Sequence, residues 1–488
     1  MVDPRTSDAA SLGPTPPRTT AVASSVPALV TEPETYPLRV DVAGDVLPRR
    51  LGFLATTALV VGTVIGSGIF RVPATVAGQV GAPSAVIIVW VLGGVISLCG
   101  AFSLAELAAA FPRSGGVYVY LRETYGPLVA FLFGWVSLVL GPAGAAGVSL
   151  IFAEYLGTLV PLERIGGARM VGVLVLVAVS AAAYRSVRGV GALISGACAA
   201  KVAAIAALVI AAFLLGDGGA GSFASGTPEA DASRWGGVGL ALVAALWAYN
   251  GFHDMVSVAG EVRDPGRVLP RALLAGMGVV VAVYLAANAA YLYVLPYDTL
   301  RSSPHVASDT MVRAIGSVGA RAVAAMVMIS AFGTIVGVTL AMPRVYYAMA
   351  RDGLFFAALG RVHPRFQTPH VAVVVYGAVA VLGAWFQSFE QLTEAFVLGV
   401  WPFLALAAAG VLVLRRTRPG LTRPYRTPGY PVVPLIFIAG TSWVVISALV
   451  ARPASTLAGM GLTLLGVPVY LLWRRAVRAG SYRRRHAM

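Results

Sequence analysis

The stretch VVGTVIGSGIFRVPATVAG, residues 60–78, is apolar along most of its length and carries Gly66-Ser67-Gly68 near its middle. A helix needs roughly 20 apolar residues to cross a bilayer core, so we expect a spanning helix over about 52–78. Each glycine weakens a helix by roughly 1 kcal/mol, and a membrane tolerates broken backbone only beside protein or a water-filled cavity. We therefore predict a break at the triplet, with close helix packing through small residues as the alternative.

The rest of the chain repeats this apolar pattern. Of its 488 residues 58% are hydrophobic and 12% are charged, whereas soluble domains are about 25% charged. We expect one all-α membrane bundle of about twelve spans over 48–475, between a disordered cytoplasmic tail at 1–47 and a basic cytoplasmic tail at 476–488. The expected spans fall at about 52–78, 84–111, 127–157, 169–184, 190–215, 236–260, 270–295, 317–348, 370–387, 391–414, 431–450 and 455–473.

The charges predict how the bundle is oriented. The net charge of +15 comes from arginines that cluster between the apolar runs, which is typical of membrane proteins and argues against a nucleic-acid partner. With the N-terminus in the cytoplasm, the inner segments hold 27 arginines and the outer segments hold 8. Positive charge favours the inner side, so we expect a multi-pass protein of the cell (inner, cytoplasmic) membrane with both termini in the cytoplasm.

The sixth expected span, LVAALWAYNGFHDMVSVAGEV at 242–262, also has polar residues near its middle. The first and sixth spans are equivalent if spans 1–5 and 6–10 form inverted repeats, over about 52–215 and 236–414. Paired interrupted helices in corresponding halves indicate the substrate site of a secondary transporter. We therefore predict a second break at Asn250-Gly251 and a cavity between the two breaks.

The polarity of the broken helices predicts the ligand. The half-helix that begins near Ile69 directs free N–H groups and partial positive charge into the gap, which favours a carboxylate. The half-helices that end near Ile65 and Tyr249 present free carbonyl oxygens, which favour an ammonium group. A site with both kinds of end suits a zwitterion, and amino acids fit best.

Five stretches carry a family resemblance. They are VGTVIGSGIFRVP (61–73), AELAAAFPRSGGVYVYLRETYGP (105–127), LWAYNGF (246–252), GEVRDPGRVLPRAL (260–273) and PRVYYAMARDGLF (343–355). In this order they resemble the amino acid–polyamine–organocation superfamily, and within it most the L-type amino acid transporters and their bacterial homologues. The resemblance runs from about Pro48 to Arg475. It implies a five-plus-five inverted-repeat fold with two extra C-terminal helices, at about 431–473, and alternating access of amino acids.

The same resemblance implies substrate contacts in the two broken spans. Trp247 matches a position where the family keeps an aromatic gate, although a lipid-facing or interfacial aromatic is the alternative. The implied substrate-binding residues are Ile65, Gly66, Ser67, Gly68, Ile69, Trp247, Ala248, Tyr249, Asn250 and Gly251.

The sequence also departs from the family pattern. Heteromeric members carry a cysteine between spans 3 and 4 for a glycoprotein subunit, but residues 158–169 have none, so no disulfide-linked subunit is expected. Asn250 and Phe252 stand where the family often has Asp or Gly and Trp, and Val400 stands at a position that is polar in some members. These changes leave the preferred amino acid open.

Lys201, the single lysine, lies within the fifth span. A charged side chain there costs at least about 3 kcal/mol and usually faces the bundle interior; a snorkelling side chain is the alternative. The resemblance implies that its ammonium takes the place of the sodium ion of sodium-coupled relatives. Lys201 is thus the candidate coupling residue, in a proton-coupled cycle if it releases its proton or in exchange if it stays charged.

Other titratable residues have weaker interpretations. His253 and Asp254 could relay protons, but polar lining of the cavity is the preferred interpretation. We assign Glu106, Arg113 and Arg122 to structure and gating. The two cysteines, Cys99 and Cys198, are interpreted as small buried hydrophobic residues. We expect no cofactor, no metal and no catalytic residues.

The sequence thus favours a sodium-independent permease of neutral L-amino acids that works as an exchanger or a proton symporter. A permease of cationic amino acids or polyamines is the first alternative. A passive facilitator or channel is less favoured because there are no rings of charge or repeated filter sequence. An intramembrane enzyme is not expected because no His-Glu-x-x-His or similar arrangement is present.

Overall fold

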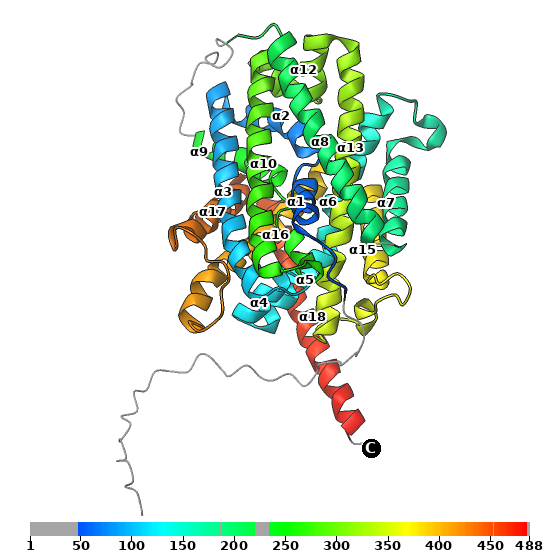
Figure 1. Cartoon of the computed structure of the whole chain (residues 1–488), viewed down its shortest axis with the longest axis vertical. Coiled ribbons are helices and arrows are strands. Elements are labelled where there is room, and N and C mark those ends of the chain that lie inside the picture. Colours follow the sequence, from blue (N-terminus) through cyan, green and yellow to red (C-terminus); the bar gives the residue numbers. More distant parts are fainter. Residues whose placement is uncertain (1–46, 186, 220–233, 452, 486–488) are drawn as a thin grey trace, which may run out of the picture. The chain divides into compact units, whose positions relative to one another are not determined.

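The computed structural model describes residues 47–185, 187–219, 234–451 and 453–485 (Figure 1). The expected tail at 1–47 therefore lies almost wholly outside the described residues. Helices make up most of the described chain. The α-helices are α1 (Phe53–Val64), α2 (Gly68–Val80), α3 (Pro83–Ala110), α4 (Val117–Tyr125), α5 (Pro127–Val139), α6 (Gly141–Gly157), α7 (Gly167–Arg185), α8 (Val187–Leu215), α9 (Arg234–Ala248), α10 (Pro265–Val294), α11 (Tyr297–Ser302), α12 (Val306–Ile315), α13 (Ser317–Ala341), α14 (Pro343–Arg351), α15 (His370–Phe386), α16 (Phe389–Thr417), α17 (Val432–Ala451) and α18 (Pro453–Arg485).

The lengths and apolar composition of these helices confirm an all-α membrane protein. In the described part of the chain, eight helical segments are long and apolar enough to cross a membrane, or nine with α1 and α2 as one bent span. Two more apolar helices, Gly237–Ala248 and His370–Phe386, are shorter. Every expected apolar run coincides with a helix or a helix pair. The number twelve, the inverted repeats and the domain limits stay predictions.

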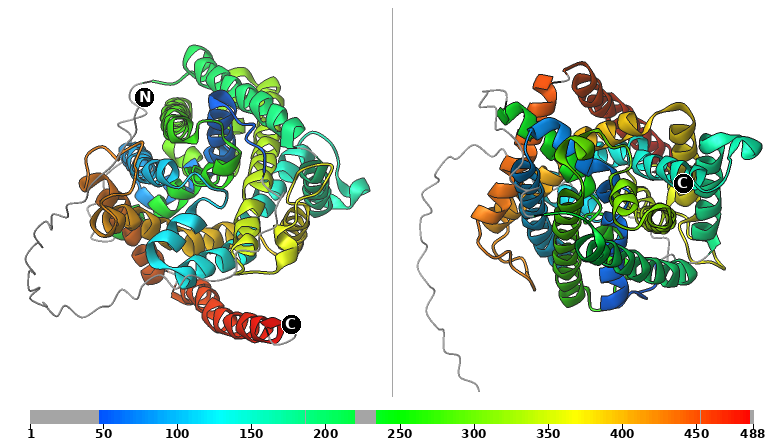
Figure 2. Two further views of the ribbon diagram at one scale, coloured as in Figure 1. Left: turned by 60° about the horizontal axis from the view of Figure 1, so that its bottom comes forward. Right: turned by 90° about the horizontal axis from the view of Figure 1, so that it is seen from above.

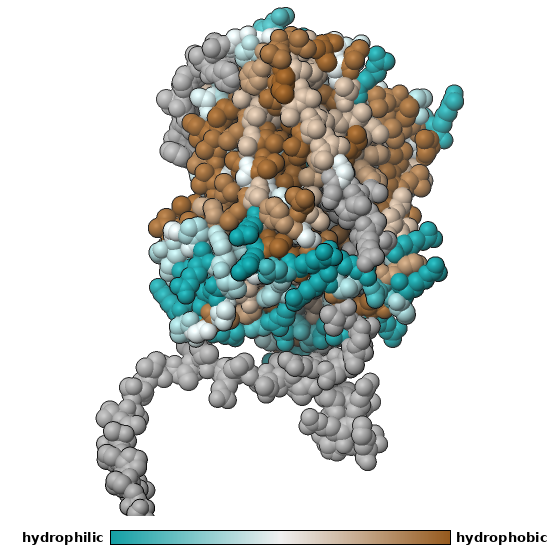
Figure 3. All heavy atoms as spheres, viewed as in Figure 1, coloured by the Kyte–Doolittle hydropathy of each residue, from teal (hydrophilic) through white to brown (hydrophobic). Residues whose placement is uncertain are grey.

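The surface of the described chain is divided into an apolar zone and a polar zone. Figure 3 shows a broad apolar band across the helices and a polar collar at the end where α4 lies. Large apolar side chains exposed on the described chain include Leu54, Ile88, Leu214 and Val450. In water such exposure would be unfavourable, whereas in lipid tails it is not. An apolar band beside a polar collar is typical of a protein that spans a membrane.

Both predicted breaks are present. The helix α1 ends at Val64, α2 starts at Gly68, and the two helices are bent by 42°. The helix α9 ends at Ala248 and is followed by turns and a 3-10 helix, η3 (Met255–Glu261).

The broken spans lie inside the bundle. The helix α1 packs against α8, α10 and α13, and α2 packs against α9. In the left view of Figure 2, α1, in dark blue, lies between green and yellow-green helices. The two breaks thus meet in the protein interior, where neighbouring side chains can receive the freed backbone groups.

Several short elements were not expected from the sequence. The helices α4, α11 and α12 lie between the apolar runs, and the last helix, α18, continues to Arg485, into the expected basic tail. The helical hydrogen bonds are interrupted at Met342, between α13 and α14, because Pro343 has no N–H to donate.

Candidate functional site

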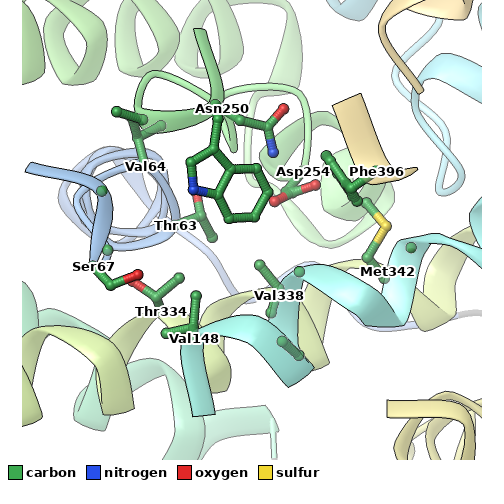
Figure 4. Close-up of a pocket in the computed structure, with 17 residues that line it drawn as sticks. Thr63, Val64, Ser67, Val148, Asn250, Asp254, Thr334, Val338, Met342 and Phe396 are labelled. Carbon is green, nitrogen blue, oxygen red and sulfur yellow. The ribbon is translucent and has the colours of Figure 1, made fainter. Parts of the chain in front are cut away.

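A small cavity lies where the two interrupted spans meet (Figure 4). Its volume is about 40 Å³, which is room for a few water molecules. An amino acid therefore fits only if the surrounding side chains move. The cavity is lined by Thr63, Val64, Gly66, Ser67, Gly68, Gly141, Gly144, Ala145, Val148, Trp247, Ala248, Asn250, Asp254, Thr334, Val338, Met342 and Phe396.

The first break supplies the N-terminal end of a helix. At Ile65 the backbone leaves the helical region, with φ −73° and ψ 88°, and Ser67 is the N-cap of α2. The first amides of a helix have no partner within it and carry partial positive charge. The Ser67 hydroxyl lines the cavity, is buried, and has no hydrogen-bond partner among the described residues. This end of the cavity suits a carboxylate.

Lys201 occupies the carbonyl end of α1. Its side chain is fully buried. Its Nζ donates to the carbonyl oxygens of Gly62 at 2.9 Å, Ile65 at 2.6 Å and Ser330 at 3.1 Å, and lies 3.3 Å from Thr334 Oγ1. Four oxygen atoms thus surround the one ammonium group. The lysine therefore does not snorkel to the surface; it holds the broken end of α1 against α13.

Tyr284, on α10, connects the ends of the two broken helices. Its hydroxyl lies 2.9 Å from the Val64 carbonyl oxygen and 3.0 Å from the Ala248 carbonyl oxygen. These are the last residues of α1 and α9, so one hydroxyl, with its single proton, bridges the carbonyl ends of both breaks. The neighbouring Tyr249 donates to the Trp90 carbonyl oxygen at 3.1 Å. Sequence reasoning missed Tyr284, because α10 reads as an unbroken apolar span.

Gly251 brings the second break against the first. Its φ of +118° is unfavourable for residues with a side chain. A Cβ at this position would lie 2.8 Å from the Thr63 carbonyl oxygen. The Thr63 hydroxyl in turn lies 3.1 Å from the Gly251 carbonyl oxygen. The residue type at 251 is therefore set by backbone conformation and by close approach to α1.

Two aromatic rings and several apolar side chains form another wall. The Trp247 ring packs edge-on against Phe396 of α16, with 5.7 Å between ring centroids. Trp247 thus lines the cavity and does not face lipid. Val338, on α13, and Met342, which follows α13, add apolar surface.

Asp254 reaches the cavity and His253 does not. Both side chains are almost fully buried, at 2% and 1% exposure. Asp254 is on the lining, and His253 Nε2 lies 3.3 Å from Asp254 Oδ1. The contact lacks hydrogen-bond geometry, so Oδ1 and both ring nitrogens have no hydrogen-bond partner within the described chain.

The structure brings most, but not all, of the implied contact residues to the cavity. Ile65, Ile69, Tyr249 and Gly251 are buried near it without lining it, and Val400 is buried without lining it. The implied residues that line the cavity are Gly66, Ser67, Gly68, Trp247, Ala248 and Asn250.

Ion pairs join the segments at the polar end of the bundle. Glu106 accepts hydrogen bonds from the Arg415 guanidinium at 2.7 and 3.0 Å, and Arg122 contacts Asp352 at 2.7 Å. Another buried pair, Arg344 and Glu261, joins α14 to η3 at 2.8 Å.

Glu123 joins three segments at the same end. It pairs with Arg113, at 2.6 Å, and with Arg418, at 2.9 Å. Burial raises the pKa of the Glu123 carboxyl, but hydrogen bonds from Arg418 and Arg113 outweigh burial and hold the pKa below its usual range. All three residues assigned from the sequence to structure and gating, Glu106, Arg113 and Arg122, thus make ion pairs away from the cavity.

Comparison with known proteins agrees with this architecture. A profile of the family described as amino acid permease matches residues 51–468. The chain is 31% identical over 428 residues to the serine/threonine exchanger SteT of Bacillus subtilis (strain 168), which covers 87% of this chain and 96% of that protein. It is 30% identical over 415 residues to the b(0,+)-type amino acid transporter 1 of Homo sapiens, covering 83% and 84%. It is also 30% identical over 435 residues to the cystine/glutamate transporter of Homo sapiens, covering 88% and 85%.

These relatives are transporters and exchangers of amino acids by name, and none is named as an enzyme. The profile match begins just before α1 and ends within α18, so it includes both broken spans. It confirms the resemblance to the amino acid–polyamine–organocation superfamily that the five sequence stretches indicated. The chain therefore belongs to the amino acid permease family.

Proposed function

We propose that this permease exchanges amino acids across the cell membrane without sodium, and binds them between its two broken helices. The α-carboxylate binds at the N-terminal end of α2, beside Ser67, and the α-ammonium binds at carbonyl oxygens of the breaks. Dipole polarity supports this orientation. The site residues are those implied by the resemblance, of which six line the cavity: Gly66, Ser67, Gly68, Trp247, Ala248 and Asn250.

The observation that carries the exchange proposal is the position of Lys201. Its ammonium already has oxygen acceptors from α1 and α13, and such charge-assisted hydrogen bonds favour a lysine that keeps its proton. A fixed positive charge at this position leaves no requirement for a sodium ion. It also favours exchange over proton symport, because symport needs a group that releases its proton in each cycle. The name of the relative SteT, an exchanger, agrees with this proposal.

The proposal includes the topology and the subunit composition. Both termini lie in the cytoplasm, which the excess of arginines in the inner segments supports. The absence of a cysteine between 158 and 169 supports a permease without a disulfide-linked glycoprotein subunit.

Counterflow in proteoliposomes tests the function. Vesicles containing the purified protein are loaded with a mixture of L-amino acids, and uptake of each labelled amino acid is measured with and without sodium and a pH gradient. We expect uptake that requires internal amino acid and does not change with sodium. Uptake into empty vesicles driven by a proton gradient would contradict exchange and indicate proton symport. An ion conductance without counterflow would contradict the transporter proposal.

A substitution of Lys201 tests its role. Lys201→Ala removes the charged donor to the carbonyl oxygens of Gly62, Ile65 and Ser330, and a hydrogen bond from a charged group contributes about 1.5–3 kcal/mol. We expect a lower unfolding temperature and a loss of exchange. Cys198→Ala, three residues earlier on α8, is the matched control and should keep both. Wild-type exchange and stability in Lys201→Ala would exclude the role given to the lysine.

A further inference from the structure

Asp254 is a buried acid that, unlike two other buried acids of the described chain, has no arginine partner. Glu106 and Glu261, which are equally buried, each pair with an arginine guanidinium. Asp254 contacts only His253 by charge, at 3.3 Å, and its Oδ1 accepts no hydrogen bond from any residue that the structure describes. A buried polar atom without a partner is costly, and such an atom in a native fold calls for an explanation.

The position of Asp254 provides an explanation for this unpaired oxygen atom. The residue lines the cavity, and in Figure 4 it lies across the cavity from Ser67 and Thr334. An amino acid whose carboxylate binds beside Ser67 extends its side chain away from the α2 end. The lining also holds Asn250, whose Oδ1 likewise has no hydrogen-bond partner among the described residues, and the apolar side chains Val338, Met342 and Phe396. Asp254 is the acidic acceptor on this lining that a polar substrate side chain would meet.

Resting on the proposed function, we infer that Asp254 binds a hydrogen-bond donor on the substrate side chain. The site thereby selects amino acids with a hydroxyl or a cationic side chain over apolar amino acids of the same shape. The physical reason is asymmetric: an apolar side chain would leave the buried acceptor unpaired. Sites built to hydrogen-bond a substrate reject analogues that lack the donor far more strongly than apolar pockets reject an added group.

The inference is tested with two pairs of substrates of equal shape. Threonine is compared with valine, and ornithine with norleucine, as competitors of counterflow in proteoliposomes. We expect the donor-bearing member of at least one pair to compete about tenfold better or more in the wild-type protein. Discrimination in the first pair identifies a hydroxyl as the donor, and discrimination in the second identifies an ammonium.

Substitutions assign the discrimination to the carboxylate. Asp254→Leu, of similar size, should bring the competing concentrations of each pair to within about twofold of each other. Asp254→Asn keeps an acceptor oxygen but no charge, so it should retain any preference for threonine and lose any preference for ornithine. Asp298→Asn, which removes an exposed carboxylate on α11, is the matched control and should change neither ratio.

The outcomes separate this inference from the proposed function. Counterflow without discrimination in either pair, or discrimination that persists in Asp254→Leu, would overturn the role of Asp254 and leave the transporter intact. Absence of counterflow for every amino acid would instead overturn the proposed function. If Asp254→Leu does not fold, Asp254→Ala is used for the same ratios, and the wild-type ratios alone still decide whether the site selects donors.

Discussion

The helix α10 carries two fully buried tyrosines, Tyr284 and Tyr291, whose hydroxyl groups differ in their contacts. The Tyr284 hydroxyl reaches the carbonyl ends of α1 and α9, whereas the Tyr291 hydroxyl has no hydrogen-bond partner within the described ranges. We expect Tyr284→Phe to destabilise the protein by about 1 kcal/mol, the net contribution of a typical hydrogen bond, and to slow exchange. Unfolding temperature and counterflow rate measure these effects.

The matched substitution Tyr291→Phe removes a hydroxyl from the same helix without removing a hydrogen bond. It should leave stability and exchange near wild type. Equal effects of the two substitutions would show that Tyr284 acts only through packing.

Among single residues, the sequence alone identified those that interrupt apolar helices. Ser67 and Asn250 are conspicuous because they stand beside glycines inside apolar runs. Tyr284 and Thr334 have no such local signal, because each comes from an unbroken helix distant in the chain. The side of Asp254 could not be assigned either, since the backbone from 249 to 254 follows no regular helical period.

Two helices of the broken spans, α2 and α9, pack closely through Gly68. A Cβ at Gly68 would lie 2.9 Å from the Cα of Ala248, and backbone at this distance cannot move aside easily. We expect Gly68→Ala to separate α2 from α9, lower the unfolding temperature and reduce exchange severely, by at least about tenfold. The counterflow rate of the purified variant checks the prediction.

Gly78→Ala is the control within the same helix, because a Cβ there would meet nothing within 4 Å. Alanine is the better helix former by about 1 kcal/mol, so this variant should be as stable as wild type or slightly more stable. Wild-type exchange in Gly68→Ala would show that the two broken helices are not tightly coupled.

The whole molecule is fastened at its polar end by buried and half-buried ion pairs. Arg344 and Glu261, at 0% and 2% exposure, join α14 to η3, the continuation of the second broken span. Removing one member leaves a buried charge, which costs about 3–5 kcal/mol. We expect Arg344→Met to lower the unfolding temperature markedly and the double variant Glu261→Gln/Arg344→Met to recover part of the loss. Additive losses in the two single variants and the double variant would contradict direct pairing.

The ion pairs of Glu123 with Arg113 and Arg418 predict that the stability of the protein depends on pH. Because the folded pKa of Glu123 is lowered, its contribution is present above the unfolded pKa of about 4.3 and is lost as the pH falls through the folded pKa. Glu123→Gln should therefore unfold at a lower temperature than wild type at neutral pH. The difference should shrink as the pH is lowered below about 4. Thermal unfolding from pH 3 to 8 measures it, with exposed Glu163→Gln as the control; a difference that is independent of pH would contradict the pairing.

The sequence by itself determined the class of the molecule, the extents of its apolar helices and the places where two of them break. These features depend on local composition: apolar length sets a span, glycine and polar residues weaken a helix, and lipid permits the break only inside the protein. The five stretches then indicated the family, which the comparisons confirmed.

Only the tertiary structure decided which groups meet at the breaks. Lys201, Tyr284 and Thr334 come from three helices far apart in the chain, and their contacts with the end of α1 depend on how those helices pack. The side of Asp254 was decided in the same way, because the turn set by Gly251, and not helical periodicity, places its carboxyl on the cavity. Local sequence specifies where backbone groups are left free, but the partners that receive them are chosen by contacts between distant segments.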